Sequence, residues 1–154
     1  MSDTEHFSLR PASLDDIEEL FAIHRAALGE YIAATWGWDD EWQQKFFRKG
    51  FDSYVRSVIE VQGVSIGFLD VTEREEGLYL ENIELAPKYQ NRGIGTEIIR
   101  SLIARAQAKR TIVRLQVLRA NPRARALYER LGFEDVGETE THFLMQHREK
   151  ITRN

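Results

Sequence analysis

The sequence predicts a mixed α/β fold in which helices cover both faces of one mixed β-sheet. Three short strand-like runs follow one another between residues 55 and 85, and the short turns between them predict an antiparallel meander. A glycine-bearing loop and an apolar-striped helix then lead to a β-branched run at residues 111–117. A strand, a helix and a strand in this order predict a parallel crossover unit. The chain has 154 residues, and we expect one domain that spans residues 1–154.

The N-terminal part of the chain is predicted to hold an edge strand and a first helix. Residues 7–10 alternate in polarity and stop at Pro11, which is typical of an edge strand. Ser13 is expected to cap the helix, with Asp16 as its acidic partner three residues later. Apolar residues then keep the helical period, and Gly29 is expected to end the helix.

A second helix is expected to begin at Asp39 or Asp40, because either side chain can cap it, and to close near Gly50. The segment that leads into this helix and its first turn are unusually rich in aromatic residues. All of the chain's tryptophans fall there: Trp36, Trp38 and Trp42.

The rest of the chain is predicted to alternate strands with helices. The helix after the glycine loop should end near Lys109; Asn121 should cap the next helix, Pro122 should start it, and Gly132 should end it. The polar segment 148–154 is expected to be a frayed tail. The element order is therefore β-α-α-β-β-β-α-β-α-β-β. Its later strands are expected at residues 55–61, 64–72, 78–85, 111–117, 133–139 and 142–147.

Composition excludes several classes of function. The chain has no cysteine, which rules out a Cys-type zinc site, a redox CxxC motif and a cysteine nucleophile, and which agrees with a reducing cytoplasm. A net charge of -4 with mixed signs argues against a nucleic-acid binder. We see no apolar run that could span a bilayer and no export signal in residues 1–10, so we expect a cytoplasmic protein without a membrane partner. The four histidines show no metal-ligand spacing, so we expect no metal.

The stretch from strand to helix around residues 80–106 is the most informative part of the sequence. Gly93 and Gly95 stand at the mouth of a helix, where exposed N–H groups and the helix dipole attract an anion. No Lys-Ser or Lys-Thr follows them, so this is not the loop that binds nucleotide triphosphates. A dinucleotide-binding fingerprint would need a third glycine and no antiparallel meander before it. The backbone donors offered to the anion run from Arg92 to Thr96.

Two motifs in the right order carry a resemblance to a known family. Gln90-Asn91-Arg92-Gly93-Ile94-Gly95 is similar to a pyrophosphate-binding loop, and Leu85-Ala86-Pro87 to the end of the strand before it. The segment from Asn121 to Phe133 carries the pattern Asn-Pro, then Ala-Leu-Tyr, then Gly-Phe. Over residues 78–136 the chain resembles the GNAT superfamily of acyl-CoA N-acyltransferases, and the element order extends the resemblance to nearly the whole chain.

The resemblance implies a donor site for acetyl-CoA. The loop from Gln90 to Thr96 would bind the pyrophosphate. Asn121 would contact the pantetheine arm, and Arg123 or Arg125 could reach a phosphate of coenzyme A. The resemblance also implies that the fourth strand splays from the fifth, which would leave backbone groups of Leu85 and Ala86 free to bind the pantetheine amides. An N–H near Leu85 could also stabilise an oxyanion, an effect worth about 3 kcal/mol for one donor.

The resemblance also implies the catalytic groups. Tyr128 stands where the family has an acid that protonates the departing thiolate, a role that suits a phenol with a pKa of about 10. The base is expected to be Glu81 or Glu84 of the fourth strand, or else a water relay that removes the need for a direct base. Successive strand residues face opposite sides of a sheet, so at most one of the two glutamates should face the acceptor. Gln116 cannot accept a proton where part of the family has a glutamate.

The resemblance places the binding site for the acceptor amine at the aromatic segment. Its aromatic and acidic side chains would form one wall of that site and would suit a cationic amine. Alternatively, the aromatic residues form only a small satellite core. The members of the wall are expected to be Tyr31, Trp36, Trp38, Asp39 and Trp42, with Asp40, Phe51 and Tyr54 as extensions.

The sequence thus predicts an N-acetyltransferase that moves an acetyl group from acetyl-CoA directly to an amine in a ternary complex. The alternative is a non-catalytic acyl-CoA sensor or interaction module with the same fold. Whether the amine belongs to a small molecule or a protein stays open, as do the acyl chain length and a homodimeric state.

Overall fold

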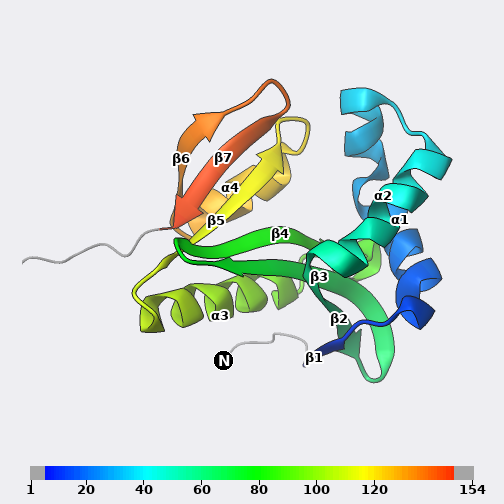
Figure 1. The fold of residues 1–154 in the computed structure, drawn as a ribbon, viewed down its shortest axis with the longest axis horizontal. Coiled ribbons are helices and arrows are strands. Elements are labelled where there is room, and N and C mark those ends of the chain that lie inside the picture. Colours follow the sequence, from blue (N-terminus) through cyan, green and yellow to red (C-terminus); the bar gives the residue numbers. More distant parts are fainter. Residues whose placement is uncertain (1–5, 148–154) are drawn as a thin grey trace, which may run out of the picture. The chain divides into compact units, whose positions relative to one another are not determined.

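A computed structural model describes residues 6–147, and the predicted tail at 148–154 lies outside these residues. The helices and strands of the described chain are labelled in Figure 1. The described chain divides into two compact units. Unit one holds the chain up to Thr72 and the segment Glu81–Gly95; unit two holds Glu73–Leu80 and the chain from Thr96 onward. Strand β4 (Gly77–Leu85) passes from unit two into unit one. That the whole chain forms one domain stays a prediction.

Unit one contains two helices and the first strands of the sheet. Strand β1 pairs antiparallel with β2. Strand β2 pairs antiparallel with β3, as the first hairpin of the predicted meander requires. The strand order here is β1-β2-β3-β4. The elements are β1 (Ser8–Pro11), a 3-10 turn (Leu14–Asp16), α1 (Ile17–Trp36), α2 (Asp40–Ser53), β2 (Val55–Val61), β3 (Val64–Arg74) and a 3-10 turn (Pro87–Tyr89).

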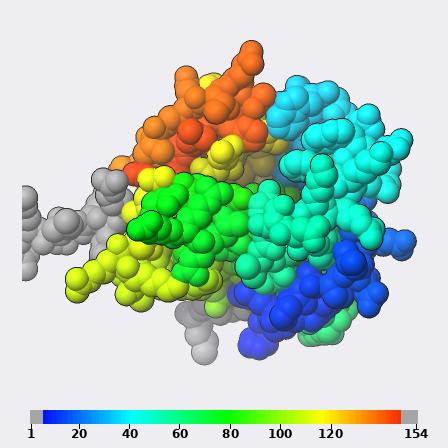
Figure 2. Space-filling view, viewed as in Figure 1, coloured from blue at the N-terminus to red at the C-terminus, as the bar shows by residue number. Residues whose placement is uncertain are grey.

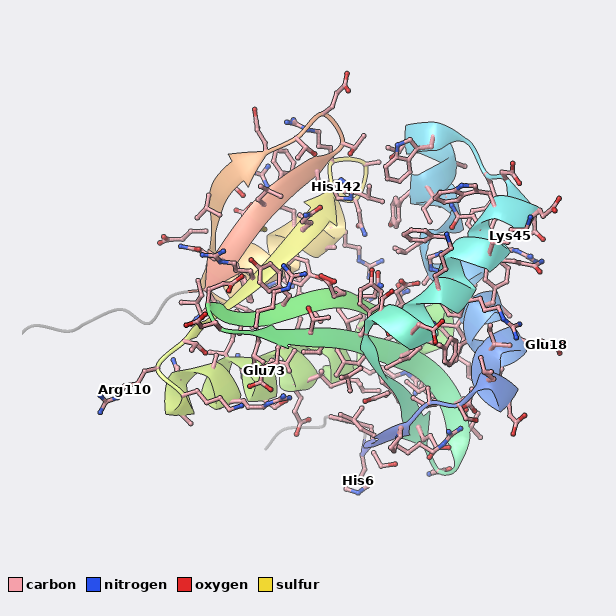
Figure 3. All side chains as sticks on the ribbon, viewed as in Figure 1. His6, Glu18, Lys45, Glu73, Arg110 and His142 are labelled. Atoms are coloured by element: carbon pink, nitrogen blue, oxygen red, sulfur yellow. The ribbon has the colours of Figure 1, made fainter. Side chains whose placement is uncertain are left out.

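Unit two completes the sheet. Strand β4 pairs parallel with β5, which confirms the predicted crossover unit. The strand order is β4-β5-β7-β6, so β7, the last strand in sequence, lies between β5 and β6. Glu73, labelled in Figure 3, binds Lys109 and Arg105 near the end of α3. The other elements are α3 (Ile94–Ala108), β5 (Ile112–Leu118), α4 (Pro122–Arg130), β6 (Phe133–Glu138) and β7 (His142–His147). The predicted mixed α/β fold is therefore confirmed.

The first helix is longer than predicted. Gly29 does not end α1, which continues to Trp36 and stops at Gly37, where φ is +82°. Gly29 keeps its helical conformation because the residues after it are good helix formers, and Trp38 packs over the space where a side chain would project. The second helix likewise continues past Gly50 to Ser53. A glycine in the sequence marks a helix end only where the chain turns left-handed.

The core of unit one lies between its helices and the sheet. Six buried residues from both helices, β2 and β3 form one cluster: Leu20, Phe21, Ile23, Phe47, Val58 and Phe68. Val58 pairs directly across from Phe68, and both contribute to this cluster, so α1 and α2 cover that face of β2 and β3. No helix among residues 6–147 is long and apolar enough to cross a membrane.

Candidate active site

The predicted anion loop has two residues with left-handed backbone. Asn91 has φ +64° and Gly93 has φ +84°, and α3 begins directly after them at Ile94. Left-handed residues beside a helix start turn successive N–H groups toward one concave surface, which is how backbone amides bind anions. A methyl group on Gly95 would meet only Leu85 Cδ1, at 3.9 Å. The protein itself therefore leaves space at Gly95, so that a ligand can approach the backbone there.

The strand end before the loop differs from the sequence-based expectation. The Leu85 carbonyl accepts a hydrogen bond from Gln90 Nε2 at 2.9 Å. The Ala86 N–H donates to the Ile66 carbonyl, and the Ala86 carbonyl accepts from Tyr89. These groups are not free, because the segment turns into a 3-10 helix against β3. A ligand donor that binds the Leu85 carbonyl would either use its second lone pair or displace the Gln90 side chain.

The parallel pairing of β4 with β5 is short. It covers four residue pairs, from Gly77↔Ile112 to Leu80↔Leu115. Strand β4 then continues from Glu81 to Leu85 as part of unit one.

Unit two holds the predicted acid and the predicted cap. The Asn121 side chain accepts from the Ala124 N–H at 3.2 Å, so its capping role is confirmed. The cap uses only the amide oxygen of the side chain, not its NH₂ group. Tyr128 is half-buried, with its ring edge-on to Phe133 at 5.8 Å between centroids. Arg123 is exposed.

Arg125 is less available than its neighbour Arg123. Its guanidinium binds Asp135 and Glu129 and lies over the Phe143 ring at 3.7 Å from the centroid. Of the two arginines considered for a coenzyme A phosphate, Arg123 is therefore the better candidate.

The two candidate bases lie in different environments. Glu84 is 3% exposed, and its side chain contacts His24 of α1. Asn82, two residues earlier, reaches Asp70 of β3, so both even-numbered positions face the layer under α1 and α2. Glu81 is half-buried, and strand alternation assigns it to the opposite face. Glu84 therefore faces that layer, and that Glu81 faces the other side of the sheet stays a prediction.

His24 is a site residue that sequence reasoning missed. Its Nδ1 lies 2.7 Å from Glu84 Oε1, and its Nε2 lies 3.3 Å from Gln43 Oε1 on α2. The signal available in the sequence was the position of His24 on the apolar stripe of α1, one turn after Leu20 and Phe21. A buried imidazole needs partners at both nitrogens, and these can only come from other elements.

Burial and charge compete in this contact. Burial lowers the pKa of His24, but the Glu84 carboxylate and the hydrogen bonds to Glu84 and Gln43 outweigh it and raise the pKa above its ordinary 6.5. Burial raises the pKa of Glu84 above 4.5, and His24 opposes this rise. The two groups therefore titrate as a coupled pair.

A second buried ion pair lies on the same face of the sheet. Arg56 binds both carboxylate oxygens of Asp70, at 2.6 and 2.7 Å, and also donates to the Phe47 carbonyl. Asn82 Nδ2 donates to Asp70 Oδ2 at 2.9 Å. Gly50 makes room for the Arg56 guanidinium, which a side chain on Gly50 would strike.

The three tryptophans of the predicted acceptor wall separate into two kinds. Trp38 packs against the core cluster, as the satellite-core interpretation predicts. Trp36 and Trp42 are 59% and 54% exposed. Trp42 stacks on the exposed Phe46, with ring centroids 5.0 Å apart and an angle of 8°. Helix α2, cyan in Figure 2, lies at the surface.

The acidic residues of the wall have partners within unit one. Asp39 caps α2 by accepting from the Trp42 N–H at 3.1 Å, which decides between the two predicted caps. Asp40 binds Arg25, Trp38 Nε1 and Gln44. Asp39 keeps one carboxylate oxygen for another partner, whereas Asp40 is largely occupied.

A groove of about 550 Å³ lies between α1 and α2. Glu18 and Lys45, labelled in Figure 3, are part of its lining. None of the predicted site residues lines it. Among residues 6–147, no three or more His, Asp or Glu side chains are grouped so that they could hold a metal ion.

Comparison with known proteins identifies the class. The family model described as the acetyltransferase (GNAT) family matches residues 17–133. The chain belongs to this family.

Two curated relatives and one solved structure extend the comparison. An uncharacterized N-acetyltransferase of Methanocaldococcus jannaschii is 29% identical over 143 residues, which cover 84% of this chain and 61% of that protein. Thialysine Nε-acetyltransferase of Bos taurus is 40% identical over 70 residues, or 45% of this chain and 41% of that protein. The chain thus spans less than two thirds of the length of either relative.

The solved structure is the PaiA N-acetyltransferase of Thermoplasma acidophilum in complex with coenzyme A. It shares the fold at a TM-score of 0.75, with 19% identity, over 94% of this chain and 99% of that one.

Proposed function

We propose that this protein is an N-acetyltransferase that transfers an acetyl group from acetyl-CoA directly to an amine in a ternary complex. The observation that carries the proposal is the family match over residues 17–133, which includes the loop with Asn91 and Gly93 in left-handed conformation. The loop and the start of α3 would bind the pyrophosphate through backbone N–H groups. Acetyl-CoA supplies the activated acyl group, and no cysteine is available for a covalent relay.

Tyr128 is the proposed acid. A thiol of ordinary acidity has a pKa of about 8.5 and a phenol one of about 10, so Tyr128 is protonated at neutral pH and can donate to the departing thiolate. Asn121 and Arg123 are the proposed contacts for the pantetheine arm and a phosphate. The half-buried ring of Tyr128 against Phe133 supports this role, because it restricts the orientation of the hydroxyl.

Glu84 is the proposed base, with Glu81 and a water relay as its rivals. Oε2 of Glu84 is buried and accepts no hydrogen bond from any residue in the described range. A buried carboxylate oxygen without a donor costs free energy, and such groups concentrate at functional sites. Burial also raises the pKa of Glu84 toward the range in which a general base is most effective.

The acceptor is proposed to be a primary aliphatic amine. One relative is, by its name, an acetyltransferase for the ε-nitrogen of thialysine, which is such an amine. The exposed Trp36 and the stacked Trp42 and Phe46 offer ring faces to a cation. Lysine, thialysine and short diamines are therefore the first acceptors to test, followed by peptides with free amines.

The test is the release of coenzyme A thiol from acetyl-CoA in the presence of each amine. We expect turnover with at least one amine, and we expect Tyr128→Phe to reduce kcat by about 10²–10⁴-fold without weakening acetyl-CoA binding. Tyr79→Phe, which removes another half-buried hydroxyl of unit two, is the matched control and should keep its kcat. A protein that acetyl-CoA stabilises thermally but that releases no thiol with any amine would instead be an acyl-CoA sensor.

A further inference from the structure

The contact between His24 and Glu84 uses only half of the carboxylate. Oε1 meets His24 Nδ1 at 2.7 Å, whereas Oε2 is buried and accepts from no group between residues 6 and 147. The Glu84 side chain is 2% exposed and that of His24 is 12% exposed. The geometry therefore holds the carboxylate at one oxygen and leaves the other for a further proton.

The surroundings of His24 do not require a polar residue. Four aromatic rings enclose the imidazole, with centroid distances of 5.3–6.4 Å: Phe21, Trp38, Phe47 and Phe68. An apolar side chain would fill this space without the desolvation that a buried ion pair costs. Packing alone thus gives no reason for a histidine here, and the contact with Glu84 does.

Gln43 determines how many protons the pair carries. Its Oε1 can only accept a hydrogen bond, so His24 Nε2 is the nitrogen that donates to it. One further proton then lies between Nδ1 and Oε1, whether it is formally held by the imidazole or by the carboxyl group. In either form Oε2 carries no proton, and it is the place where the next proton binds.

We propose that His24 is a positioning residue for the base: it holds Glu84 through Oε1 and keeps the carboxylate ready to accept the acceptor's proton at Oε2. This inference rests on the proposed function. The proton passes from the ammonium nitrogen to the buried Oε2 through an intervening water, the pair gains one positive charge, and the proton later returns to solvent by the same route. The amine is then free to attack the acyl carbon.

The other charged groups that face Glu84 are already paired. Arg56 of β2 and Asp70 of β3 bind each other through two hydrogen bonds, so their opposing effects on Glu84 largely cancel. Gln43 on α2 and Asn82 on β4 are neutral. His24 of α1 is therefore the cation that decides how readily Glu84 takes up a proton.

The first experiment replaces the cation and keeps a hydrogen-bond donor. In His24→Gln, the pKa of Glu84 should rise further because burial then acts with less opposition. The acidic limb of the kcat profile should move upward by about 1–3 pH units, with recovery at high pH. The KM for acetyl-CoA should stay unchanged. His6→Gln, at the exposed residue labelled in Figure 3, is the matched control.

The outcomes separate positioning from mere structure. A His24→Gln variant whose kcat falls equally at every pH, or does not change at all, overturns the inference. If His24→Gln does not fold, His24→Asn takes its place, because it is also neutral and retains an amide donor.

The second experiment needs no substrate. Imidazole ¹⁵N shifts should show that His24 titrates above pH 6.5 in the wild type and at a lower pH in Glu84→Gln, because the anion that opposes burial is gone. Glu76→Gln, at an exposed turn residue, is the control and should leave His24 unchanged. An unchanged His24 titration in Glu84→Gln overturns the inference. If no amine supports turnover in the wild type, the proposed function fails, and the His24 titration still decides whether the pair exists.

Discussion

Unit one contains two buried ion pairs on one face of its sheet, and they are built differently. The pair of Arg56 and Asp70 is saturated: both carboxylate oxygens accept from Arg56, and Asn82 adds a further bond to one of them. The pair of His24 and Glu84 is not, because Glu84 Oε2 accepts from no side chain or backbone group in residues 6–147.

The difference shows what each pair is for. A guanidinium stays charged at any accessible pH, so the saturated pair has no proton to exchange and serves to hold β2, β3 and α2 together. An imidazole changes charge near neutral pH. Burial raises the pKa of the Glu84 carboxyl group above 4.5, so the unsaturated pair can exchange a proton. Stability should therefore depend on the first pair and turnover on the second.

The largest expected effect comes from breaking the saturated pair. Asp70→Asn should lower the free energy of unfolding by about 3–5 kcal/mol, because it leaves a buried guanidinium without its anion. Urea denaturation measures this loss. Glu84→Gln should lower the free energy of unfolding far less, because the glutamine amide N–H can donate to Nδ1 of neutral His24. The kcat of Glu84→Gln should fall by about 10²–10⁴-fold. Equal losses of stability in both variants would remove the distinction between the pairs.

A double variant separates charge from packing at the saturated pair. Arg56→Met with Asp70→Leu removes both charges and should recover much of the loss seen in Asp70→Asn. It should stay about 1–3 kcal/mol below the wild type, since the Phe47 carbonyl and the Asn82 amide lose their partners. No recovery in the double variant would show that the ion pair itself stabilises the fold.

Two glycines test whether the backbone also has some positions that serve stability and others that serve function. A methyl group on Gly67 would strike the Glu84 carbonyl, so Gly67→Ala should cost about 1–3 kcal/mol of unfolding free energy. The space at Gly95 is open on the protein side, so the bulky substitution Gly95→Leu should change stability little and strongly weaken acetyl-CoA binding. Denaturation and calorimetric titration measure the two effects. Full acetyl-CoA binding by Gly95→Leu would contradict the loop assignment.

The unsaturated pair should also give stability a characteristic pH dependence. The pKa of His24 and that of Glu84 are both raised in the folded state, so the folded protein holds protons that the unfolded chain has released. The stability due to His24 is present below pH 6.5 and is lost as the pH rises through its raised pKa. Glu84 acts in the same direction from pH 4.5 upward. Unfolding free energy should therefore fall as the pH rises.

Glu84→Gln should flatten this fall, because it removes the titration of Glu84 and lowers the pKa of His24. Asp16 provides an internal control of opposite sign. Its hydrogen bond with Arg10 lowers its pKa to about 2, so the corresponding stability is lost only as the pH falls below its ordinary 3.8. The loss of stability in acid that is due to Asp16 should be the same in the wild type and in Glu84→Gln. A wild-type free energy of unfolding that does not fall as the pH rises above 6.5 would contradict the coupling.

The smallest expected effect on function concerns the exposed aromatic surface. Trp42→Ala should change the unfolding free energy by no more than about 0.5 kcal/mol, because the ring is 54% exposed. It should raise the KM for the amine by about 2–5-fold if the stacked rings bind a cation. Val64→Ala, at another side chain that is 54% exposed, is the control. An unchanged KM would leave Trp42 outside the acceptor site.

Local chemistry explains which parts of the fold were predictable. Strand β2 begins and ends where its β-branched pattern does, and Asn121 caps α4 as its position before Pro122 indicates. Gly29 misled the prediction because helix continuation depends on the residues after it and on Trp38 packing over it. The insertion of β7 between β5 and β6 was not predictable, since strand order depends on pairing between distant segments.

The site divides in the same way. The anion loop was predictable because its glycines and the helix start are neighbours in sequence. That Glu84 rather than Glu81 faces the layer under α1 and α2 depends on the phase of β4, which strand alternation alone leaves open. The prediction that backbone groups of Leu85 and Ala86 are free was wrong for the Leu85 carbonyl and for both backbone groups of Ala86. The Gln90 side chain, Ile66 of β3 and Tyr89 of the 3-10 turn bind them.

The sequence by itself determined the element types, the Asn121 cap, the glycine loop and the family, because each depends on residues close together along the chain. The tertiary structure alone decided that His24, Gln43 and Glu84 meet, and that Arg56 is committed to Asp70. The physical reason is distance along the chain: His24 and Glu84 are 60 residues apart. A buried charge selects its partner by the packing of helices on a sheet, which no local pattern encodes.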